Sequence, residues 1–377
     1  MRAAVYRGRG DIRIEDIAEP VPLGDELLIR VTAVGICGTD GHEFAHGPFQ
    51  FAVPSRSPWG PAGALVPGHE FAGVVVGMGS NVTGFGEGDL VASASGVACG
   101  ECQWCRRGRT NLCLRYETVG LQRHGGLAQL CVVPAASCAV VDPEILTPDA
   151  AALGQPMAIA VHAVSRGEPA AGMEVLVIGA GGIGAFLVFA LAQSGARVSV
   201  IEADASRREL ALRLGATRAV PPPPPAPLRP YAPSAPPAPP TPPDALQDAF
   251  GEGHSPELVY EVTGNPGGLG LALGSLGRGT RLVLVGLQGA PAELDLRRLS
   301  LIEAELIGTN AVVAADDLPR ALQLLGRRPG SWADVAPVAL ALEDLVDQGL
   351  RPLASGTSTR VKTLVDPWTP VTRRTQL

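Results

Sequence analysis

The chain has 377 residues, which is long enough for two folding units whose hydrophobic cores need no disulfide support. Hydrophobic residues make up 46% and charged residues 18%, a composition typical of a globular protein. The net charge of -7 gives no basic surface for nucleic acid or for an anionic membrane, so neither is expected as a partner. The only lysine, Lys362, lies near the C-terminus in a V-K-T-L-V run that predicts a strand. This position argues against a P-loop and against catalysis by a lysine side chain.

Residues 1–156 are predicted to form a β-rich unit. Apolar runs at 27–34, 71–76 and 90–94 are bounded by Gly and Pro, as expected of short strands. The segment that follows Met1 is charged and contains no apolar region typical of a signal peptide, so we expect a cytoplasmic protein.

Residues 157–310 show the alternation of strands and helices that predicts a parallel α/β sheet. Further strands of this sheet are expected at 258–262, 281–285 and 304–307. The remaining residues, 311–377, return to mixed character and are expected to pack on the first unit. The predicted fold class is therefore α/β, with a β-rich domain beside a doubly wound parallel sheet.

Two segments are open to misinterpretation. Residues 175–192 are uncharged and almost wholly apolar, which suggests a membrane span by hydropathy alone. They divide into a strand, a glycine turn and a helix, and this division favours a protein without a membrane span. Residues 221–243 contain 14 of the 35 prolines, so this stretch is expected to be an extended insert or a docking ligand for a proline-binding domain.

A glycine loop follows the predicted strand at 175–178 and opens a helix, in the pattern G-x-G-x-x-G. The first glycine permits a tight turn, the second lets the backbone approach a pyrophosphate, and the third lets helix and strand pack closely. An acid about twenty residues later would accept hydrogen bonds from a ribose and repel a 2′-phosphate, which favours NAD over NADP. A nearby arginine would weaken that preference. The predicted cofactor-binding residues are Gly179, Gly181, Gly182, Ile183, Gly184, Glu202 and Arg207.

Four cysteines occur within fifteen residues, in a lobe at about 95–115. Thiolates at this spacing predict a closed tetrahedral zinc site of the structural kind, formed by Cys99, Cys102, Cys105 and Cys113. An iron-sulfur cluster is the main alternative, and disulfides or free thiols are further ones. A zinc site without an open position would hold the lobe together and do no chemistry.

A second group of metal-binding side chains is dispersed. Cys37 lies in G-I-C-G-T-D-G-H, and His69 and Glu70 are adjacent in P-G-H-E-F. Each alone is more typical of a structural residue. Beside a dinucleotide loop, the mixed sulfur, nitrogen and oxygen ligands favour a zinc ion with an open position for a substrate oxygen.

These motifs resemble those of the zinc-dependent medium-chain dehydrogenase/reductase family, and within it the polyol branch of sorbitol and butanediol dehydrogenases. The resemblance covers nearly the whole chain. It implies a GroES-like catalytic domain, a Rossmann domain, two zinc ions per chain, and a homodimer or homotetramer. The segments that carry it are G-I-C-G-T-D-G-H (35–42), G-H-E-F-A-G (68–73), C-G-E-C-Q-W-C-R-R-G with N-L-C (99–113), Q-P-M-A-I-A-V-H-A (155–163), V-L-V-I-G-A-G-G-I-G (175–184) and S-R-R-E-L-A-L-R-L-G-A (206–216).

The resemblance also implies roles for further residues. Cys37, His69 and Glu70 match the first three catalytic zinc ligands, and Gln155 stands where polyol enzymes commonly carry a glutamate near the metal. Asp40 matches the carboxylate that orients the ligand histidine. Thr39 and His42 match the proton relay of the family, and Phe44 replaces a tyrosine that related sequences often carry.

The resulting hypothesis is NAD-linked oxidation of a small-molecule secondary alcohol, assisted by zinc. The metal lowers the pKa of the substrate hydroxyl, the proton leaves through Thr39, the cofactor ribose and His42, and hydride passes to the nicotinamide. A vicinal diol or polyol is the expected substrate, and Gln155 makes oxidation of an aldose such as glucose at its anomeric carbon the nearest alternative. A non-catalytic, zinc-stabilised binding protein on the same fold is the alternative from another class.

Overall fold

The computed structural model describes residues 1–51, 64–223 and 255–377. They form two compact units, one of Met1–Ile159 with Ala311–Leu377 and the other of Ala160–Asn310. Most of the proline-rich stretch at 221–243 lies outside the described residues, so its predicted extended form stays a prediction.

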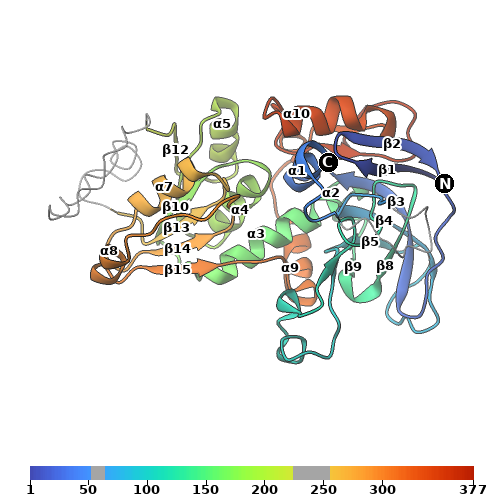
Figure 1. Cartoon of the computed structure of the whole chain (residues 1–377), viewed down its shortest axis with the longest axis horizontal. Helices are drawn as coiled ribbons and strands as arrows, with labels where there is room; N and C mark the ends of the chain where they lie inside the picture. Colours follow the sequence, from blue (N-terminus) through green and yellow to red (C-terminus); the bar gives the residue numbers. More distant parts are fainter. Residues whose placement is uncertain (52–63, 224–254) are drawn as a thin grey trace. The chain divides into compact units, whose positions relative to one another are not determined.

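The first unit is built on a mixed sheet with the order β18-β16-β17-β3-β4-β5-β9, in which β8 also pairs with β3 (Figure 1). A hairpin of β1 and β2 and a small pair of β6 and β7 accompany it. The strands are β1 (Arg2–Gly8), β2 (Asp11–Asp16), β3 (Glu26–Gly35), β4 (Glu70–Met78), β5 (Leu90–Ser93), β6 (Gly96–Val97), β7 (Glu117–Thr118), β8 (Leu130–Pro134), β9 (Cys138–Val140), β16 (Val338–Leu340), β17 (Leu364–Val365) and β18 (Arg373–Arg374).

The helical segments of this unit are short. They are α1 (Gly38–His46), α2 (Pro148–Ala151), the start of α3 (Gly154–Gly167), α9 (Ala314–Gly326), α10 (Arg351–Ala354), the 3-10 turns η1 (Cys105–Arg107), η2 (Thr110–Leu112), η3 (Ala135–Ser137), η4 (Trp332–Asp334) and η5 (Leu342–Asp344), and the π-helical η6 (Leu345–Leu350). The core joins both ends of the chain, because Ile29 and Val34 of β3 pack in one cluster with Leu340 and Val365. The alternating burial of β3 is that of a strand with one face in this core.

The second unit is a parallel sheet with the order β12-β11-β10-β13-β14-β15 (Figure 1). Its strands are β10 (Glu174–Ile178), β11 (Arg197–Ile201), β12 (Arg218–Val220), β13 (Leu258–Glu261), β14 (Arg281–Leu284) and β15 (Glu305–Gly308). Strand order therefore reverses direction between β10 and β13, as in a Rossmann fold. Ligands bind outside the carboxyl ends of the strands at such a reversal.

Helices α4 (Gly182–Gln193), α5 (Ala205–Arg213), α7 (Pro266–Gly274) and α8 (Leu296–Leu301) connect the strands of this sheet, and most of α3 also belongs to the unit. Helix α4 leads from β10 to β11, and α7 leads from β13 to β14, so the two connections run in opposite directions along the sheet. Because both crossovers are right-handed, α4 and α7 lie on opposite faces of the sheet. Strands β10 and β11 are buried along all but their first residue, which explains their continuous apolar sequence.

The predicted fold class is confirmed, since a mixed β-rich unit accompanies a doubly wound parallel sheet. The segment at 175–192 divides between β10 and α4, as expected from its glycine turn. In the described part of the chain, no helix combines the length and the apolar character needed to cross a membrane.

Candidate active site and metal centres

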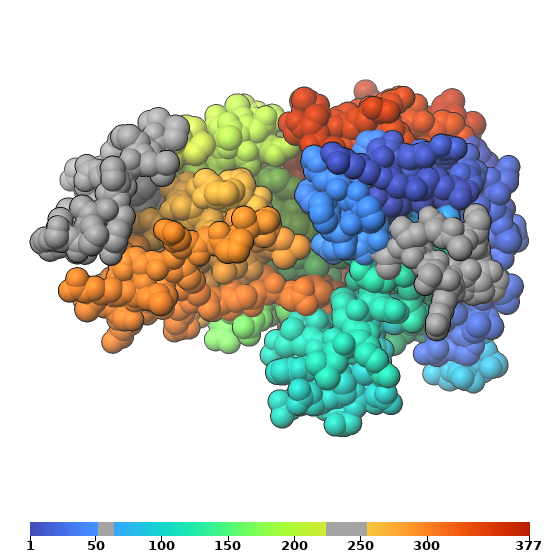
Figure 2. Space-filling view, in the orientation of Figure 1, coloured from blue at the N-terminus to red at the C-terminus, as the bar shows by residue number. Residues whose placement is uncertain are grey.

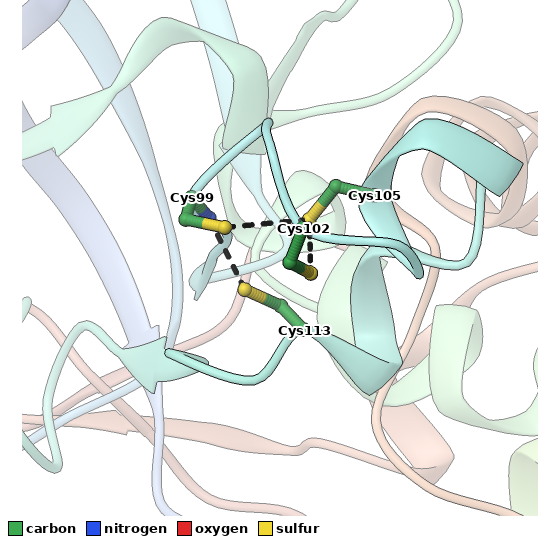
Figure 3. Close-up of side chains that lie close together, drawn as sticks. All are labelled: Cys99, Cys102, Cys105 and Cys113. Carbon is green, nitrogen blue, oxygen red and sulfur yellow. Dashed lines mark hydrogen bonds between the residues drawn. The ribbon is translucent and has the colours of Figure 1, made fainter.

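The four cysteines of the lobe converge on one point (Figure 3). Their sulfur atoms all lie within 4.8 Å of one another. The Sγ atoms of Cys99 and Cys105 are 3.9 Å apart, and those of Cys102 and Cys105 are 3.5 Å apart. A zinc ion with Zn–S bonds of about 2.3 Å needs sulfur pairs about 3.8 Å apart in a tetrahedron, so these side chains fit zinc.

The lobe that holds this site is a loop closed at its base by β6 and β7, which pair in antiparallel fashion. Figure 2 shows it as a teal knob on the surface of the first unit. Gly108 ends η1 with a φ of 74°, a conformation that favours glycine, and the chain turns there toward Cys113. Because the lobe has little core of its own, a metal ion would be its main source of order.

Hydrogen bonds already favour ionised sulfur in part of the group. The backbone N–H groups of Glu101 and Cys102 lower the pKa of Cys99 to about 6. The N–H groups of Cys99 and Arg115 both donate to Cys113 Sγ, at 3.2 and 3.3 Å. Burial and the neighbouring thiols raise the pKa of Cys105 to about 12. All four sulfurs can therefore be thiolates near neutral pH only around a cation.

The dispersed residues Cys37, His69 and Glu70 form the second group, with ligand atoms within 4.8 Å of one another. The pairing of β3 with β4 brings them together, because Gly35 at the end of β3 is in register with Glu70 at the start of β4. Cys37 follows two residues after β3, and a Cβ at Gly35 would overlap the Glu70 carboxylate. The sheet, rather than sequence proximity, thus builds this site.

Asp40 connects the two halves of the second group. One carboxylate oxygen accepts the N–H of Cys37 at 2.8 Å, and the other lies 3.7 Å from His69 Nδ1. Burial raises the pKa of Asp40, and His69 partly offsets this effect. Burial alone would lower the pKa of His69, but the charges of Asp40, Cys37 and Glu70 raise it to about 10. A metal ion on the ring would replace that proton, and Asp40 would then orient the imidazole.

Lys362 also belongs to this site, although the sequence analysis gave it no place there. Its Nζ donates to both oxygens of Glu70 at 2.5 Å and to the carbonyl of Ile36 at 3.3 Å. Both Lys362 and Glu70 are buried. Lys362 lies two residues before the first residue of β17, and β17 pairs with the end of β3. The V-K-T-L-V run indicated the strand correctly but gave no sign of what the strand lies beside.

The predicted relay residues lie on α1, which Cys37 precedes. Thr39 Oγ1 is 3.8 Å from Cys37 Sγ, and His42 is exposed one turn further along the helix. Phe44 is buried in the core of the first unit, and Gln155 is buried in the first turn of α3. The place of Gln155 as a fourth ligand stays a prediction.

Two glycines of the loop in the second unit are required by close packing, and a third leaves space for a ligand. Gly179 has a φ of 97°, and a Cβ there would meet the Thr263 methyl group at 2.8 Å. A Cβ at Gly184 would overlap the carbonyl of Gly179. Gly181, at the N-cap of α4, faces open space, where the nearest atom to such a Cβ would be Arg207 Nη1 at 3.8 Å. The helix N-terminus with Gly182 and Ile183 in its first turn therefore has room for a pyrophosphate.

Glu202 directly follows β11 and is buried against the glycine loop. Its carboxylate accepts the N–H of Ala180 at 2.7 Å and that of Asp204 at 2.9 Å. A carboxylate has about four acceptor positions, so two remain for the hydroxyls of a ribose. Arg207 lies on α5 beside the same loop, where a cation would bind a phosphate.

Sequence reasoning missed Glu261 at the end of β13. This fully buried carboxylate accepts the N–H groups of Thr263 at 2.7 Å and Gly264 at 3.1 Å, and the side-chain amide of Gln288 at 3.0 Å. It therefore fixes the loop that packs on Gly179. The available signal was an acid at the carboxyl end of a strand beside the reversal of strand order.

Comparison with known proteins agrees with this geometry. The family described as "Alcohol dehydrogenase GroES-like domain" matches residues 24–143, and the family described as "Zinc-binding dehydrogenase" matches residues 182–327. The first match contains both metal-binding groups, and the second begins within the glycine loop.

The chain is 38% identical to L-galactonate-5-dehydrogenase of Escherichia coli over 190 residues, which span 50% of this chain and 52% of that relative. It is 31% identical to sorbitol dehydrogenase of Bacillus subtilis over 290 residues, or 76% of this chain and 75% of the relative. A candidate zinc-binding dehydrogenase from Sinorhizobium meliloti 1021, solved with NADP, superposes with a TM-score of 0.81 at 26% identity, over 97% of this chain and 99% of that one.

The chain therefore belongs to the zinc-dependent medium-chain dehydrogenase family, in its polyol branch. It is an oxidoreductase of the alcohol dehydrogenase type, with zinc and a nicotinamide dinucleotide as cofactors. This membership removes the alternative of a non-catalytic binding protein.

Proposed function

We propose that this enzyme oxidises a secondary hydroxyl of a vicinal diol or polyol with NAD. The observation that carries the proposal is the group of Cys37, His69 and Glu70, with Asp40 bonded to the N–H of Cys37 and close to His69, in a chain whose glycine loop has room for a dinucleotide. This combination supplies a mixed-ligand zinc site and a hydride acceptor, which together define alcohol oxidation.

When bound, zinc supplies a Lewis acid that lowers the pKa of a coordinated hydroxyl, and the nicotinamide supplies the hydride acceptor. The protein residues then hold and move the proton. Thr39 lies beside Cys37, where its hydroxyl would accept the substrate proton, and the exposed imidazole of His42 would pass that proton to solvent. Asp40, whose free oxygen lies 3.7 Å from His69 Nδ1, would orient the ligand histidine once the metal is bound.

Lys362 has an electrostatic role in this scheme. The site gathers the side chains of Cys37, Asp40 and Glu70 in buried surroundings, and the ammonium group bound to Glu70 is the cation that offsets them. By holding both oxygens of Glu70, it would weaken that carboxylate as a metal ligand and keep the zinc ion electrophilic.

The relatives support a polyhydroxylated substrate, because sorbitol and L-galactonate both carry chains of neighbouring hydroxyls. Gln155 favours an aldose oxidised at its anomeric carbon as the second candidate. An amide near the metal keeps an oxygen ligand and removes a negative charge.

Initial rates on 2,3-butanediol, sorbitol, glucose and threonine, each with NAD and with NADP, test the proposal. The diol or sorbitol should give the highest kcat/KM. A preference for glucose would replace the polyol with an aldose, and a preference for threonine would reject both. Absence of turnover on any hydroxyl substrate by protein carrying two zinc ions per chain would overturn the proposed chemistry.

The preference for NAD rests on the buried carboxylate of Glu202 beside the glycine loop. Two observations favour NADP instead: Arg207 beside the glycine loop could bind a phosphate, and the similar structure from Sinorhizobium meliloti was solved with NADP. A 2′-phosphate beside Glu202 would meet like charge, so we expect a lower KM for NAD. Glu202→Gln should narrow the ratio of the two KM values, while Glu209→Gln on the outer part of α5 should leave that ratio unchanged.

We further propose a homodimer or homotetramer in the cytoplasm. Strand β15 ends the described sheet with mostly exposed residues, and an unpaired edge of this kind favours pairing with a second chain. Exposed apolar side chains occur in this strand and in the segment that leads to it, namely Leu287, Leu294, Leu296, Leu301 and Leu306. Light scattering of purified protein would test the assembly. The cytoplasm suits the four clustered thiols, which must stay reduced to bind zinc.

A further inference from the structure

Helix α1 contains a pattern that neither metal-binding group uses. Residues 42–46 read H-E-F-A-H, which matches the H-E-x-x-H motif of helices that bind zinc. In that motif two imidazoles one turn apart hold the metal, and the glutamate acts as a general base. The pattern therefore raises two separate questions, one about the glutamate and one about the histidines.

Glu43 is not available as a base. It is 1% exposed, and its carboxylate accepts the N–H groups of Phe49 at 2.8 Å, Gln50 at 2.7 Å and Phe51 at 3.3 Å. These bonds fold the segment after α1 back on the helix. The carboxylate thus stabilises a turn, and hydrolysis of the metalloprotease kind is excluded at this motif.

His42 and His46, in contrast, present their rings to solvent on one face of α1. Both side chains are exposed, and their ring centroids are 5.3 Å apart. Phe49 also lies beside His42, with ring centroids 5.2 Å apart. Imidazoles four residues apart on a helix can bind one cation together.

The end of α1 is held firmly enough to keep this pair in place. The carbonyl of Phe44 accepts the N–H of Gly10 at 2.7 Å, and that of Ala45 accepts Arg9 Nε at 2.9 Å. A cation bound by the two rings would therefore not need to order the helix first.

The surroundings of His46 neither attract nor repel a cation strongly. His46 lines a pocket of about 470 Å³ together with Asp347 and Arg351, and these two form an ion pair at 3.0 Å. Their charges offset each other, and the pocket leaves space for water molecules that would complete the coordination of a metal ion.

We propose that His42 and His46 form a third metal site, which takes a divalent cation with a preference for imidazole, such as Ni²⁺ or excess Zn²⁺. Two imidazoles and water bind such ions more weakly than the two zinc sites do, so this site fills only when free metal is in excess. It binds the metal reversibly and leaves both zinc ions in place.

Occupancy of this site inhibits the enzyme, and this part of the proposal rests on the proposed proton relay. A metal ion on His42 takes the nitrogen lone pair that would otherwise accept the relayed proton. Turnover should therefore fall as the site fills, and removal of the metal by a weak chelator should restore it.

The experiment uses the full chain without a histidine tag, loaded with two zinc ions and titrated with NiCl₂ by calorimetry. Wild type should bind one further Ni²⁺ per chain and lose activity over the same concentration range. His46→Gln should bind Ni²⁺ at least about tenfold more weakly and resist inhibition, with unchanged turnover when Ni²⁺ is absent. His254→Gln, which lies outside the described residues, is the control for loss of a histidine elsewhere.

Each outcome separates the site from the relay. Failure of wild type to bind a further Ni²⁺, or equal binding by His46→Gln, overturns the metal site. Binding at the pair without loss of turnover overturns the inhibition and moves the proposed proton path away from His42. Zinc analysis after the titration must still give two ions, because inhibition by exchange of catalytic zinc would persist in His46→Gln and reject the proposal.

Discussion

The two groups of candidate zinc ligands in this enzyme are assembled in different ways. The four cysteines of the lobe lie within fifteen residues, and a small loop brings them together. Cys37, His69 and Glu70, the proposed catalytic group, depend on the register between β3 and β4. Their counter-charge, Lys362, comes from the C-terminal part of the chain. The lobe is a local structure that a metal ion completes, whereas the catalytic group is a product of the whole first unit.

The groups also differ in the charges around the metal. In the lobe, backbone N–H groups support ionised sulfur, and the sulfur atoms fill all positions of a tetrahedron. In the group of Cys37, His69 and Glu70, the carboxylate of Asp40 lies beside the ligand imidazole, and the ammonium group of Lys362 binds the ligand carboxylate. A closed coordination sphere suits a structural role, and an incomplete one with balanced charge suits chemistry.

The strongest test of this contrast is loss of a catalytic ligand. Cys37→Ser should retain the lobe zinc, lose the catalytic zinc and lower kcat by on the order of 10³-fold or more, since a Lewis-acid metal contributes several kcal/mol. Metal analysis and initial rates measure both effects. Cys138→Ser is the matched control, because Cys138 on β9 belongs to neither group. Full activity in Cys37→Ser would reject the catalytic assignment.

The reciprocal test removes a ligand from the lobe. Cys102→Ser should leave one zinc per chain, keep kcat within about threefold at 25 °C, and lower the melting temperature by several degrees. A loss of about 2 kcal/mol corresponds to roughly 4–8 °C for a unit of this size. Calorimetry and limited proteolysis of the lobe check the result. If this variant lost catalysis and kept its melting temperature, the lobe would be the catalytic zinc site and the group of Cys37, His69 and Glu70 the structural one.

Lys362 offers a test of how the catalytic group is balanced. Lys362→Met leaves Glu70 buried without its cation, which should destabilise the zinc-free protein by about 3–5 kcal/mol. Bound zinc can replace the lost positive charge, so the zinc-loaded variant should be destabilised less. Chemical denaturation with and without chelator measures the difference. Lys362→Arg is the control that keeps the charge, and equal destabilisation of both forms would show that Lys362 acts on packing alone.

The contrast also explains what could be predicted from the sequence. The lobe ligands and the glycine loop were predictable because each is a local pattern with a fixed spacing, and the structure brings both together as expected. Predicted strands such as 27–34 and 71–76 agree with β3 and β4 within a few residues, since their burial is encoded in local composition. The grouping of Cys37 with His69 and Glu70 was predicted from their ligand types beside a dinucleotide loop, and the family resemblance then matched them to three zinc ligands, because no local spacing connects them.

Lys362 and Glu43 show where local patterns fail. A lysine within an apolar run is buried only if a distant acid accepts it, and nothing near Lys362 in the sequence indicates Glu70. Glu43 matches a motif for a catalytic base, yet three backbone N–H groups after the helix engage its carboxylate. In both cases a long-range or turn-dependent contact, rather than the residue type, decides the role.

The smallest expected effect is a difference in pH dependence between the two groups in zinc-free protein. The pKa of Cys99 is lowered to about 6, so its contribution to stability is present above its unfolded value of 9.0 and is lost as pH falls through about 6. The pKa of His69 is raised to about 10, so its contribution is present below its unfolded value of 6.5 and is lost as pH rises through about 10. Between pH 6.5 and pH 9, rising pH should therefore favour the folded lobe and disfavour the folded catalytic group.

Denaturation of zinc-free wild type, Cys99→Ser and His69→Gln across this range would separate the two trends. As pH rises, the free energy of unfolding of Cys99→Ser should fall relative to that of wild type. The free energy of unfolding of His69→Gln should approach or exceed that of wild type. If the stability of both variants changed in the same direction relative to wild type, the two groups would respond to pH alike. The proposed contrast between a lobe that favours thiolates and a site whose own charges are balanced would then be rejected.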